Sequence, residues 1–136
     1  MNNRSIFPIR IYYEDTDAGG VVYHARYLHF FERARTEFLR EKGASQNELI
    51  QQQDIAFVVK KMELDFRYPA RLDDLLTVET TLVEVKNASL IFTQKLTKGD
   101  QLYCSANVSI ACVKITHMKP TAIPQGIKTL LKYEKP

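Results

Sequence analysis

The chain has 136 residues, of which 45% are hydrophobic and 26% are charged, and its formal net charge is +3. These values predict one globular domain over residues 1–136 that buries a substantial core. The charge is too small for a nucleic-acid-binding surface, although it suits a substrate that carries phosphates. No apolar run approaches the about 20 residues of a membrane span, and the N-terminus lacks the apolar region of a signal peptide. We therefore expect a cytoplasmic protein with no transmembrane segment.

The first expected strand runs from Phe7 to Tyr13, where apolar and polar residues alternate. Its inward face would carry Phe7, Ile9, Ile11 and Tyr13. The sequence Glu-Asp-Thr-Asp-Ala-Gly-Gly at residues 14–20 contains the small and polar residues of a turn, and it predicts the end of this strand.

A long helix is predicted over residues 24–42, ending before Gly43. Large apolar residues recur along one side of it at helical spacing, and the stripe is wide enough to make this helix the buried centre of the domain. The stripe contains Tyr27, Leu28, Phe30, Phe31, Ala34, Phe38 and Leu39. Ser45 followed by Glu48 then forms a capping-box sequence, which opens a short second helix to about Gln53.

Four more strands are predicted in the second half of the chain, over residues 55–66, 75–85, 90–96 and 103–112. A connection over residues 68–74 and a tight turn over residues 98–100 separate them. Pro120 and Pro124 predict the end of regular structure. The order of strand, long helix, short helix and four strands indicates an α+β fold, in which an antiparallel sheet covers the long helix.

Cys104 and Cys112 fall on the same face of the last predicted strand, about 26 Å apart along it. This separation is too large for a disulfide, so we expect two small buried side chains. The three histidines show no close pairing with cysteine, and the sequence predicts no metal site.

The segment over residues 12–24, with the sequence YYEDTDAGGVVYH, concentrates the candidate chemistry. Asp17 precedes the positive end of the helix dipole, where a carboxylate can attack a carbonyl or activate water; a turn-forming or capping role fits the spacing equally well. Gly19 and Gly20 permit positive φ and a close approach of backbone to substrate. We assign Val21 and Tyr23 to the same substrate-binding loop.

Other residues of this segment are candidates for supporting roles. Asp15 could hydrogen-bond the turn or raise the pKa of Asp17 by repulsion between like charges, and Tyr13 is assigned a supporting role beside it. The imidazole of His24 could order water, or only its backbone N–H could act. On the helix, the carboxylates Glu32 and Glu37 are expected to pair with nearby arginines, such as Arg33, Arg35 or Arg40.

The motif at residues 12–24, followed by Arg26-Tyr27-Leu28 and by FERARTE at residues 31–37, resembles the hotdog-fold thioesterases of the 4-hydroxybenzoyl-CoA thioesterase type. Within that family it is most similar to the Tol-Pal-associated acyl-CoA thioesterases. The similarity extends through AFVV at 56–59, PARLDD at 69–74 and MKP at 118–120, so it covers nearly the whole chain.

The resemblance implies a hotdog fold, in which a five-stranded antiparallel sheet wraps around a long central helix. It implies homodimers, often paired into homotetramers, with active sites at the dimer interface. It also implies that Asp17 is the catalytic nucleophile or general base, and that a backbone N–H near His24 polarises the thioester carbonyl.

The activity implied is hydrolysis of an acyl-CoA with a short acyl chain, and possible activity on acyl carrier protein, without a cofactor. Lys60, Arg71 and Lys119 would then be candidate contacts for the phosphates of coenzyme A, although each one taken alone fits a solvated surface charge better. Two other functions stay open: a dehydratase on the same fold, and a non-enzymatic binding or scaffolding protein of envelope or phospholipid-synthesis machinery.

Overall fold

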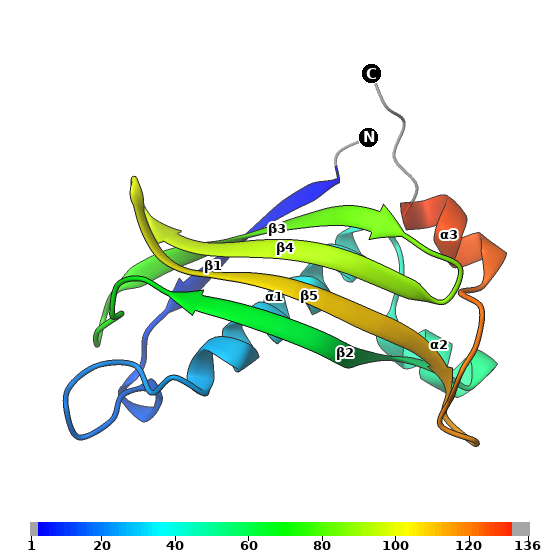
Figure 1. Cartoon of the computed structure of the whole chain (residues 1–136), viewed down its shortest axis with the longest axis horizontal. Helices are drawn as coiled ribbons and strands as arrows, with labels where there is room; N and C mark the ends of the chain where they lie inside the picture. Colours follow the sequence, from blue (N-terminus) through cyan, green and yellow to red (C-terminus); the bar gives the residue numbers. More distant parts are fainter. Residues whose placement is uncertain (1–2, 132–136) are drawn as a thin grey trace.

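The computed structural model describes residues 3–131, in which a curled sheet wraps around one long helix (Figure 1). The elements in chain order are β1 (Arg4–Arg10), the 3-10 turn η1 (Tyr13–Asp15), α1 (Arg26–Glu41), α2 (Gln46–Gln53), β2 (Ile55–Phe66), β3 (Leu75–Val85), β4 (Ser89–Lys98), β5 (Gln101–Lys114), β6 (Lys119–Pro120) and α3 (Gln125–Leu131).

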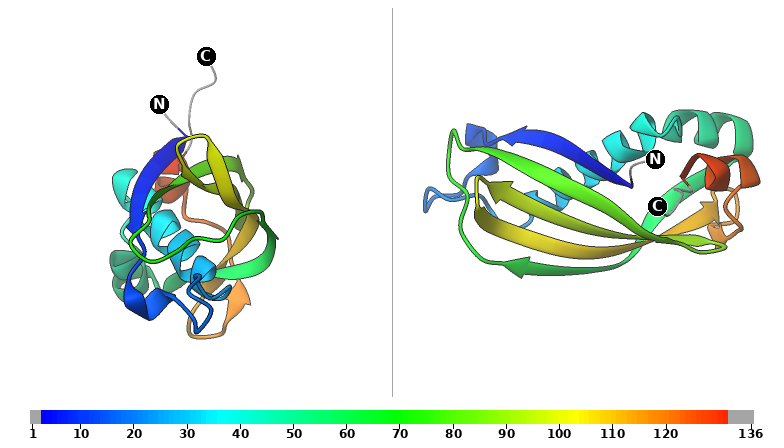
Figure 2. Two further views of the ribbon diagram at one scale, coloured as in Figure 1. Left: turned by 90° about the vertical axis from the view of Figure 1, so that its left-hand side faces the viewer. Right: turned by 90° about the horizontal axis from the view of Figure 1, so that it is seen from above.

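The sheet is antiparallel, with the strand order β1-β3-β4-β5-β2, and the two-residue β6 pairs with β5. The five long strands confirm the predicted sheet, and β6 is an addition. Figure 2 shows α1 enclosed by the concave side of this sheet, which is the α+β hotdog architecture expected from the resemblance. β1 and β2 form the two edges, so β2 has one side without a strand partner among the described residues.

The core lies between α1 and the concave face of the sheet. Phe30, Phe31 and Phe38 are completely buried on α1, and Phe38 packs edge-to-face on Phe92 of β4 with ring centroids 5.4 Å apart. Each buried phenylalanine contributes about 2–3 kcal/mol through the apolar surface that it removes from water. Leu28 was expected in the same stripe, but it is 41% exposed because it lies about 100° around the helix from the buried Tyr27.

The first strand differs from its prediction at both ends. It begins at Arg4 and ends at Arg10, and Tyr13 lies in η1 with 83% of its surface exposed rather than on the inward face. The side chain of Asp15 causes the early end, because its Oδ2 accepts a hydrogen bond of 2.8 Å from the backbone N–H of Tyr12 and closes a turn there.

Regular structure also continues beyond Pro124, contrary to the prediction. Pro124 lies just before α3, and its carbonyl accepts hydrogen bonds of 3.0 Å from the N–H groups of Ile127 and Lys128. Proline is compatible with this position because the first N–H groups of a helix have no partner within the helix. Ile127 and Leu131 bury the inner side of α3 against the core.

Arg35 was one of three candidate partners for the carboxylates of Glu32 and Glu37, but it forms no ion pair with either. Its guanidinium is buried in the core, where Nη1 donates a 3.0 Å hydrogen bond to Oε1 of Gln94 on β4. Gln94 in turn donates to the carbonyl of Phe31 and to the hydroxyl of Thr80. Burial lowers the pKa of Arg35, and the charge of Glu32 opposes this only in part. The expected pairing of Glu37 is confirmed with Arg40.

Two other expectations are confirmed, namely the capping contact of α2 and the burial of both cysteines. Ser45 accepts a hydrogen bond from the N–H of Glu48 at the start of α2. Cys104 and Cys112 are free thiols buried on the same face of β5, and burial raises the pKa of Cys104 to about 12. Within residues 3–131, no helix is long and apolar enough to cross a membrane, and no three His, Cys, Asp or Glu side chains lie where they could hold a metal ion.

Candidate active site

Asp17 lies in a closed loop between η1 and α1. Its N–H donates to the carbonyl of Val21 over 2.9 Å, and its carbonyl accepts from the N–H of Gly20 over 3.0 Å. Gly20 has φ of +83°, a backbone conformation that glycine adopts without a steric penalty. The carboxylate is exposed, and its Oδ1 accepts a 2.8 Å hydrogen bond from the N–H of Gly19. The second carboxylate oxygen makes no hydrogen bond or ion pair with residues 3–131.

Gly19 lies directly beside the carboxylate of Asp17. A Cβ atom at position 19 would lie 3.2 Å from Oδ1 of Asp17, which is tighter than most real Cβ contacts. The absence of a side chain at this position therefore allows the carboxylate to fold back over the loop and leaves its second oxygen free.

A distant segment of the chain fixes this loop in place. The N–H of Val22 donates to the carbonyl of Ala70 over 2.8 Å, and Val21 forms a β-bridge with Arg71. The hydroxyl of the buried Tyr27 on α1 accepts a 3.2 Å hydrogen bond from the N–H of Ala70. The connection between β2 and β3 thus joins the loop to the first turn of α1, and it brings Arg71 beside the loop as a candidate phosphate contact.

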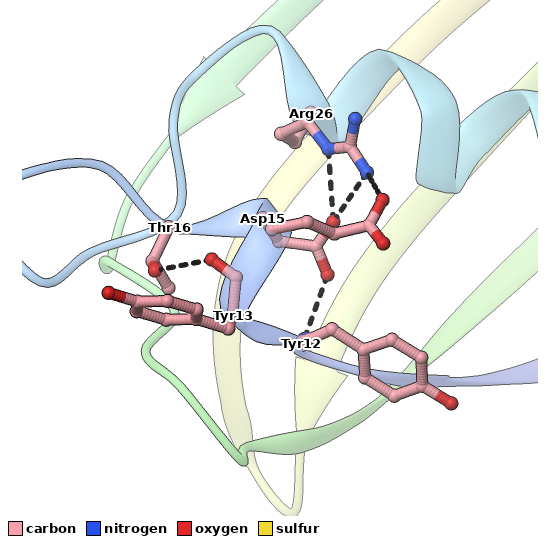
Figure 3. A network of polar contacts seen from close by, with 6 residues as sticks. Tyr12, Tyr13, Asp15, Thr16 and Arg26 are labelled. Carbon is pink, nitrogen blue, oxygen red and sulfur yellow. Dashed lines mark hydrogen bonds and ion pairs between the residues drawn. The ribbon is translucent and has the colours of Figure 1, made fainter.

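Asp15 links the two ends of the same loop (Figure 3). Its carboxylate is only 5% exposed, and Oδ1 accepts from Nε and Nη2 of Arg26 at 2.9 and 2.7 Å. Its other oxygen accepts from the N–H of Tyr12, and its backbone carbonyl accepts from the N–H of Tyr23 over 3.0 Å. Arg26 also contacts Glu14 over 3.0 Å, and hydrogen bonding to Asp15 is the main reason that its pKa is raised.

Two backbone N–H groups remain free at the start of α1. In the part of the chain that the structure describes, neither His24 nor Ala25 donates its N–H to an acceptor, whereas the N–H of Arg26 already donates to Tyr23. Such groups carry the positive end of the helix dipole. They can hydrogen-bond an oxygen that gains negative charge, which is the role that the family resemblance implies for a backbone N–H near His24.

A hollow of ≈ 300 Å³ adjoins this helix start and opens between α1 and the end of β2. The ring of Tyr27 forms part of its wall and packs edge-to-face on Phe66, with centroids 5.4 Å apart. The imidazole of His24 also lines it and packs at a tilt of 47° against the exposed ring of Tyr23, with ring centroids 4.5 Å apart. The remaining wall residues are Val22, Arg67, Tyr68 and Pro69.

The structure separates the predicted site residues into two groups. Those of the loop lie together with Arg71, namely Asp15, Asp17, Gly19, Gly20, Val21, Tyr23 and His24. Lys60 is exposed on the edge strand β2, at a register shift between Val59 and Lys61. Lys119 pairs with Lys114 of β5, and Lys114 pairs with Ile55, the first residue of β2. The hollow instead adjoins Phe66, the last residue of β2. Within one chain, Lys119 therefore lies at the opposite end of the sheet.

The sequence reasoning did not assign roles to Arg26 or Tyr27. The position of Arg26 could have predicted an ion pair, because a basic residue in the first turn of a helix interacts unfavourably with the helix dipole unless an acidic partner lies nearby. The acidic pair at residues 14 and 15 could have supplied it. Tyr27 was read only as core, and nothing in its local sequence indicates that its hydroxyl meets the N–H of Ala70.

The family model of the thioesterase-like superfamily matches residues 12–131, and the chain belongs to this superfamily. It is 51% identical over 135 residues to the acyl-CoA thioesterase YbgC of Haemophilus influenzae, with 99% of both chains covered. It is 48% identical over 128 residues to the acyl-CoA thioester hydrolase YbgC of Escherichia coli O6:H1, covering 92% of this chain and 95% of the relative.

A solved structure of a related protein has the same fold as this chain. The probable thioesterase from Bartonella henselae superposes with a TM-score of 0.85 at 40% sequence identity, covering 89% of this chain and 99% of that chain. The family resemblance and the hotdog fold expected from the sequence are therefore confirmed.

Proposed function

We propose that this protein hydrolyses acyl-CoA thioesters, with Asp17 as the reacting carboxylate. The observation that carries the proposal is the pairing of an exposed carboxylate, held by a rigid loop, with two free N–H groups at the start of α1. The names of the relatives from H. influenzae and E. coli support coenzyme A thioesters as the substrate class.

The reaction uses both parts of this arrangement. The free oxygen of Asp17 either attacks the thioester carbon or removes a proton from water that attacks it. In both cases the carbonyl oxygen becomes negative, and the N–H groups of His24 and Ala25 stabilise that charge. The C–S bond then breaks, the sulfur leaves as thiolate and takes up a proton, and water supplies the oxygen of the free acid, directly or by hydrolysing the acyl–Asp17 anhydride.

We further propose that the acyl group is short. The aromatic hollow beside His24 supports this, because ≈ 300 Å³ is at the lower end of the range for small-molecule sites. Acyl groups on acyl carrier protein are included as a second class of substrate. No cofactor takes part in the proposed chemistry.

The assembly and cellular setting also belong to the proposal. The edge strand β2 supports association of two copies, since its outer side has no strand partner among residues 3–131. Pairs of such dimers would form the expected tetramer, in which Lys60 and Lys119 could reach coenzyme A from a neighbouring copy. We also propose a cytoplasmic location, and an association with the Tol-Pal system as the family resemblance implies.

Release of free thiol from a panel of acyl-CoAs, from acetyl to palmitoyl and benzoyl, tests the proposal. We expect turnover of the shorter members, and a loss of about 100- to 10,000-fold in kcat for Asp17→Asn. Asp100→Asn is the matched control, because it makes the same chemical change in the exposed turn between β4 and β5.

Unchanged turnover in Asp17→Asn would remove this residue from the chemistry. No turnover by the wild-type protein on any thioester would overturn the hydrolase proposal and favour a binding protein or a dehydratase. A preference for palmitoyl-CoA would contradict the short acyl group alone. Sedimentation velocity of the same samples measures the oligomeric state independently.

A further inference from the structure

We propose that Asp15 and Arg26 are positioning residues, whose ion pair holds the Asp17 loop at a fixed place relative to the free N–H groups of α1. This inference rests on the proposed function for its catalytic consequence, although its structural part stands independently. Neither side chain is assigned a contact with substrate; both act through the backbone that carries Asp17.

The argument begins with how the loop is closed. Asp15 lies at its start and Tyr23 at its end, and the 3.0 Å hydrogen bond from the N–H of Tyr23 to the carbonyl of Asp15 joins them. His24, whose N–H is free, follows Tyr23 directly, and Asp17 follows Asp15 by two positions. Any shift of Asp15 therefore changes the position of the carboxylate relative to that N–H.

The side chain of Asp15 then fixes the start of the loop to the helix. In Figure 3, Arg26 extends from the first turn of α1 to one carboxylate oxygen of Asp15, while the other oxygen faces the backbone of Tyr12. Charge-assisted bonds of 2.7 and 2.9 Å through two different nitrogens determine orientation as well as distance. Burial of this carboxylate keeps water from competing for the same bonds.

The location of Arg26 favours a positioning role over simple stabilisation of the helix. A positive charge in the first turn opposes the dipole of α1, so Arg26 lowers the intrinsic stability of the helix that carries it. The two carboxylates that it contacts, Asp15 and Glu14, belong to η1 and not to α1. The favourable interaction therefore joins two elements whose relative placement defines the site.

The test combines hydrogen exchange with kinetics in Asp15→Asn, Arg26→Gln and Arg26→Lys. Arg40→Gln is the matched control, because it breaks an exposed arginine–glutamate pair at the other end of the same helix. We expect amide exchange at Val22 and Tyr23 to accelerate at least about tenfold in Asp15→Asn, while amides of the β4–β5 hairpin stay protected.

In the kinetics, we expect kcat to fall about 10- to 100-fold in Asp15→Asn and less in Arg26→Gln, with KM changed by less than about threefold. Arg26→Lys should recover part of the loss, and the double variant Asp15→Asn/Arg26→Gln should lose less than the product of the single losses. Exchange and kcat that match wild type in all three variants would overturn the inference. If the wild-type protein has no thioesterase activity and Asp15→Asn still accelerates exchange, the proposed function is overturned. The role of the Asp15–Arg26 ion pair in holding the loop then stands.

Discussion

Arg26 and Arg35 lie on the same helix, yet they occupy contrasting regions of the molecule. Arg26 lies at the site end, partly exposed, with two carboxylates around it that raise its pKa. Arg35 lies in the middle of the core, where a neutral glutamine accepts its hydrogen bond and burial lowers its pKa. The site end thus uses opposite charges near water, whereas the core uses hydrogen bonds between buried groups.

This contrast predicts which substitutions affect stability and which affect turnover. The exposed part of the charged contacts at the site end, between Arg26 and Glu14, can be altered with a modest loss of stability, because water screens and replaces it. Removal of a hydrogen-bond partner in the core leaves a buried polar group without solvation, and it lowers the free energy of unfolding more than the loss of an exposed charged contact does. Substitutions in the core should therefore affect unfolding most, and those in the loop should affect turnover.

The largest expected effect on stability is that of Phe31→Ala. Phe31 is completely buried on α1, and its truncation should lower the free energy of unfolding by about 3–5 kcal/mol. Leu28→Ala on the exposed side of the same helix is the control, with an expected change below about 1 kcal/mol. Urea unfolding measures both, and equal losses would contradict the division between the two sides of α1.

Gln94→Leu should have the next largest effect, since it removes the acceptor of Arg35 and leaves the guanidinium buried without a hydrogen bond. We expect a loss of about 2–3 kcal/mol. The double variant Arg35→Met/Gln94→Leu should be more stable than Gln94→Leu alone, because no charge then remains in the core. A double variant that is less stable than both single variants would show that Arg35 has another essential partner.

In the loop, Gly20→Ala should cost about 1–2 kcal/mol, because φ of +83° places an added Cβ against its own backbone. Gly126→Ala provides the comparison: nothing lies within 4 Å of the added Cβ in α3, and φ there is not positive. That variant should gain up to about 1 kcal/mol. Thermal unfolding of the two variants should shift in opposite directions; a shift in the same direction would contradict the backbone argument.

The smallest expected effect concerns Cys104, which belongs to the core although its strand partner is Phe66 at the site end. Burial raises the pKa of its thiol to about 12, so the reactive thiolate is scarce at pH 8. Ellman's reagent should leave the folded protein essentially unmodified at pH 8 and should modify it quickly in 6 M guanidinium. Fast reaction in the folded state would show that this part of the core opens readily.

Sequence patterns predicted the sheet, the central helix and the Asp17 motif because each depends on residues that lie close together in the chain. The alternation in β5 and the apolar stripe of α1 are examples, and so is the capping contact between Ser45 and Glu48. Local periodicity determines such elements almost completely, since it reflects which face of each element is buried.

The corrected predictions depend on long-range contacts. Arg35 looked like a surface charge on the helix until the sheet placed Gln94 and Thr80 around it. The 3-10 turn that ends β1 depends on the carboxylate of Asp15, which Arg26 in turn orients. Periodicity carries no information about partners that meet only in the folded chain. For Arg26 the sequence offered a basic residue in the first turn of a helix and an acidic pair at residues 14 and 15, and for Arg35 it offered no signal.

The attachment of the loop to the β2–β3 connection has a consequence for folding kinetics. Ile11 exchanges hydrogen bonds with Asp73 and Asp74, and Val22 donates to Ala70, so the loop depends on residues that are synthesised much later. Closing such long loops slows folding and postpones these contacts until the sheet has assembled. On the ribosome, the emerging N-terminal half carries the whole motif and cannot yet act, and thioester hydrolysis begins only after the second half has folded onto it.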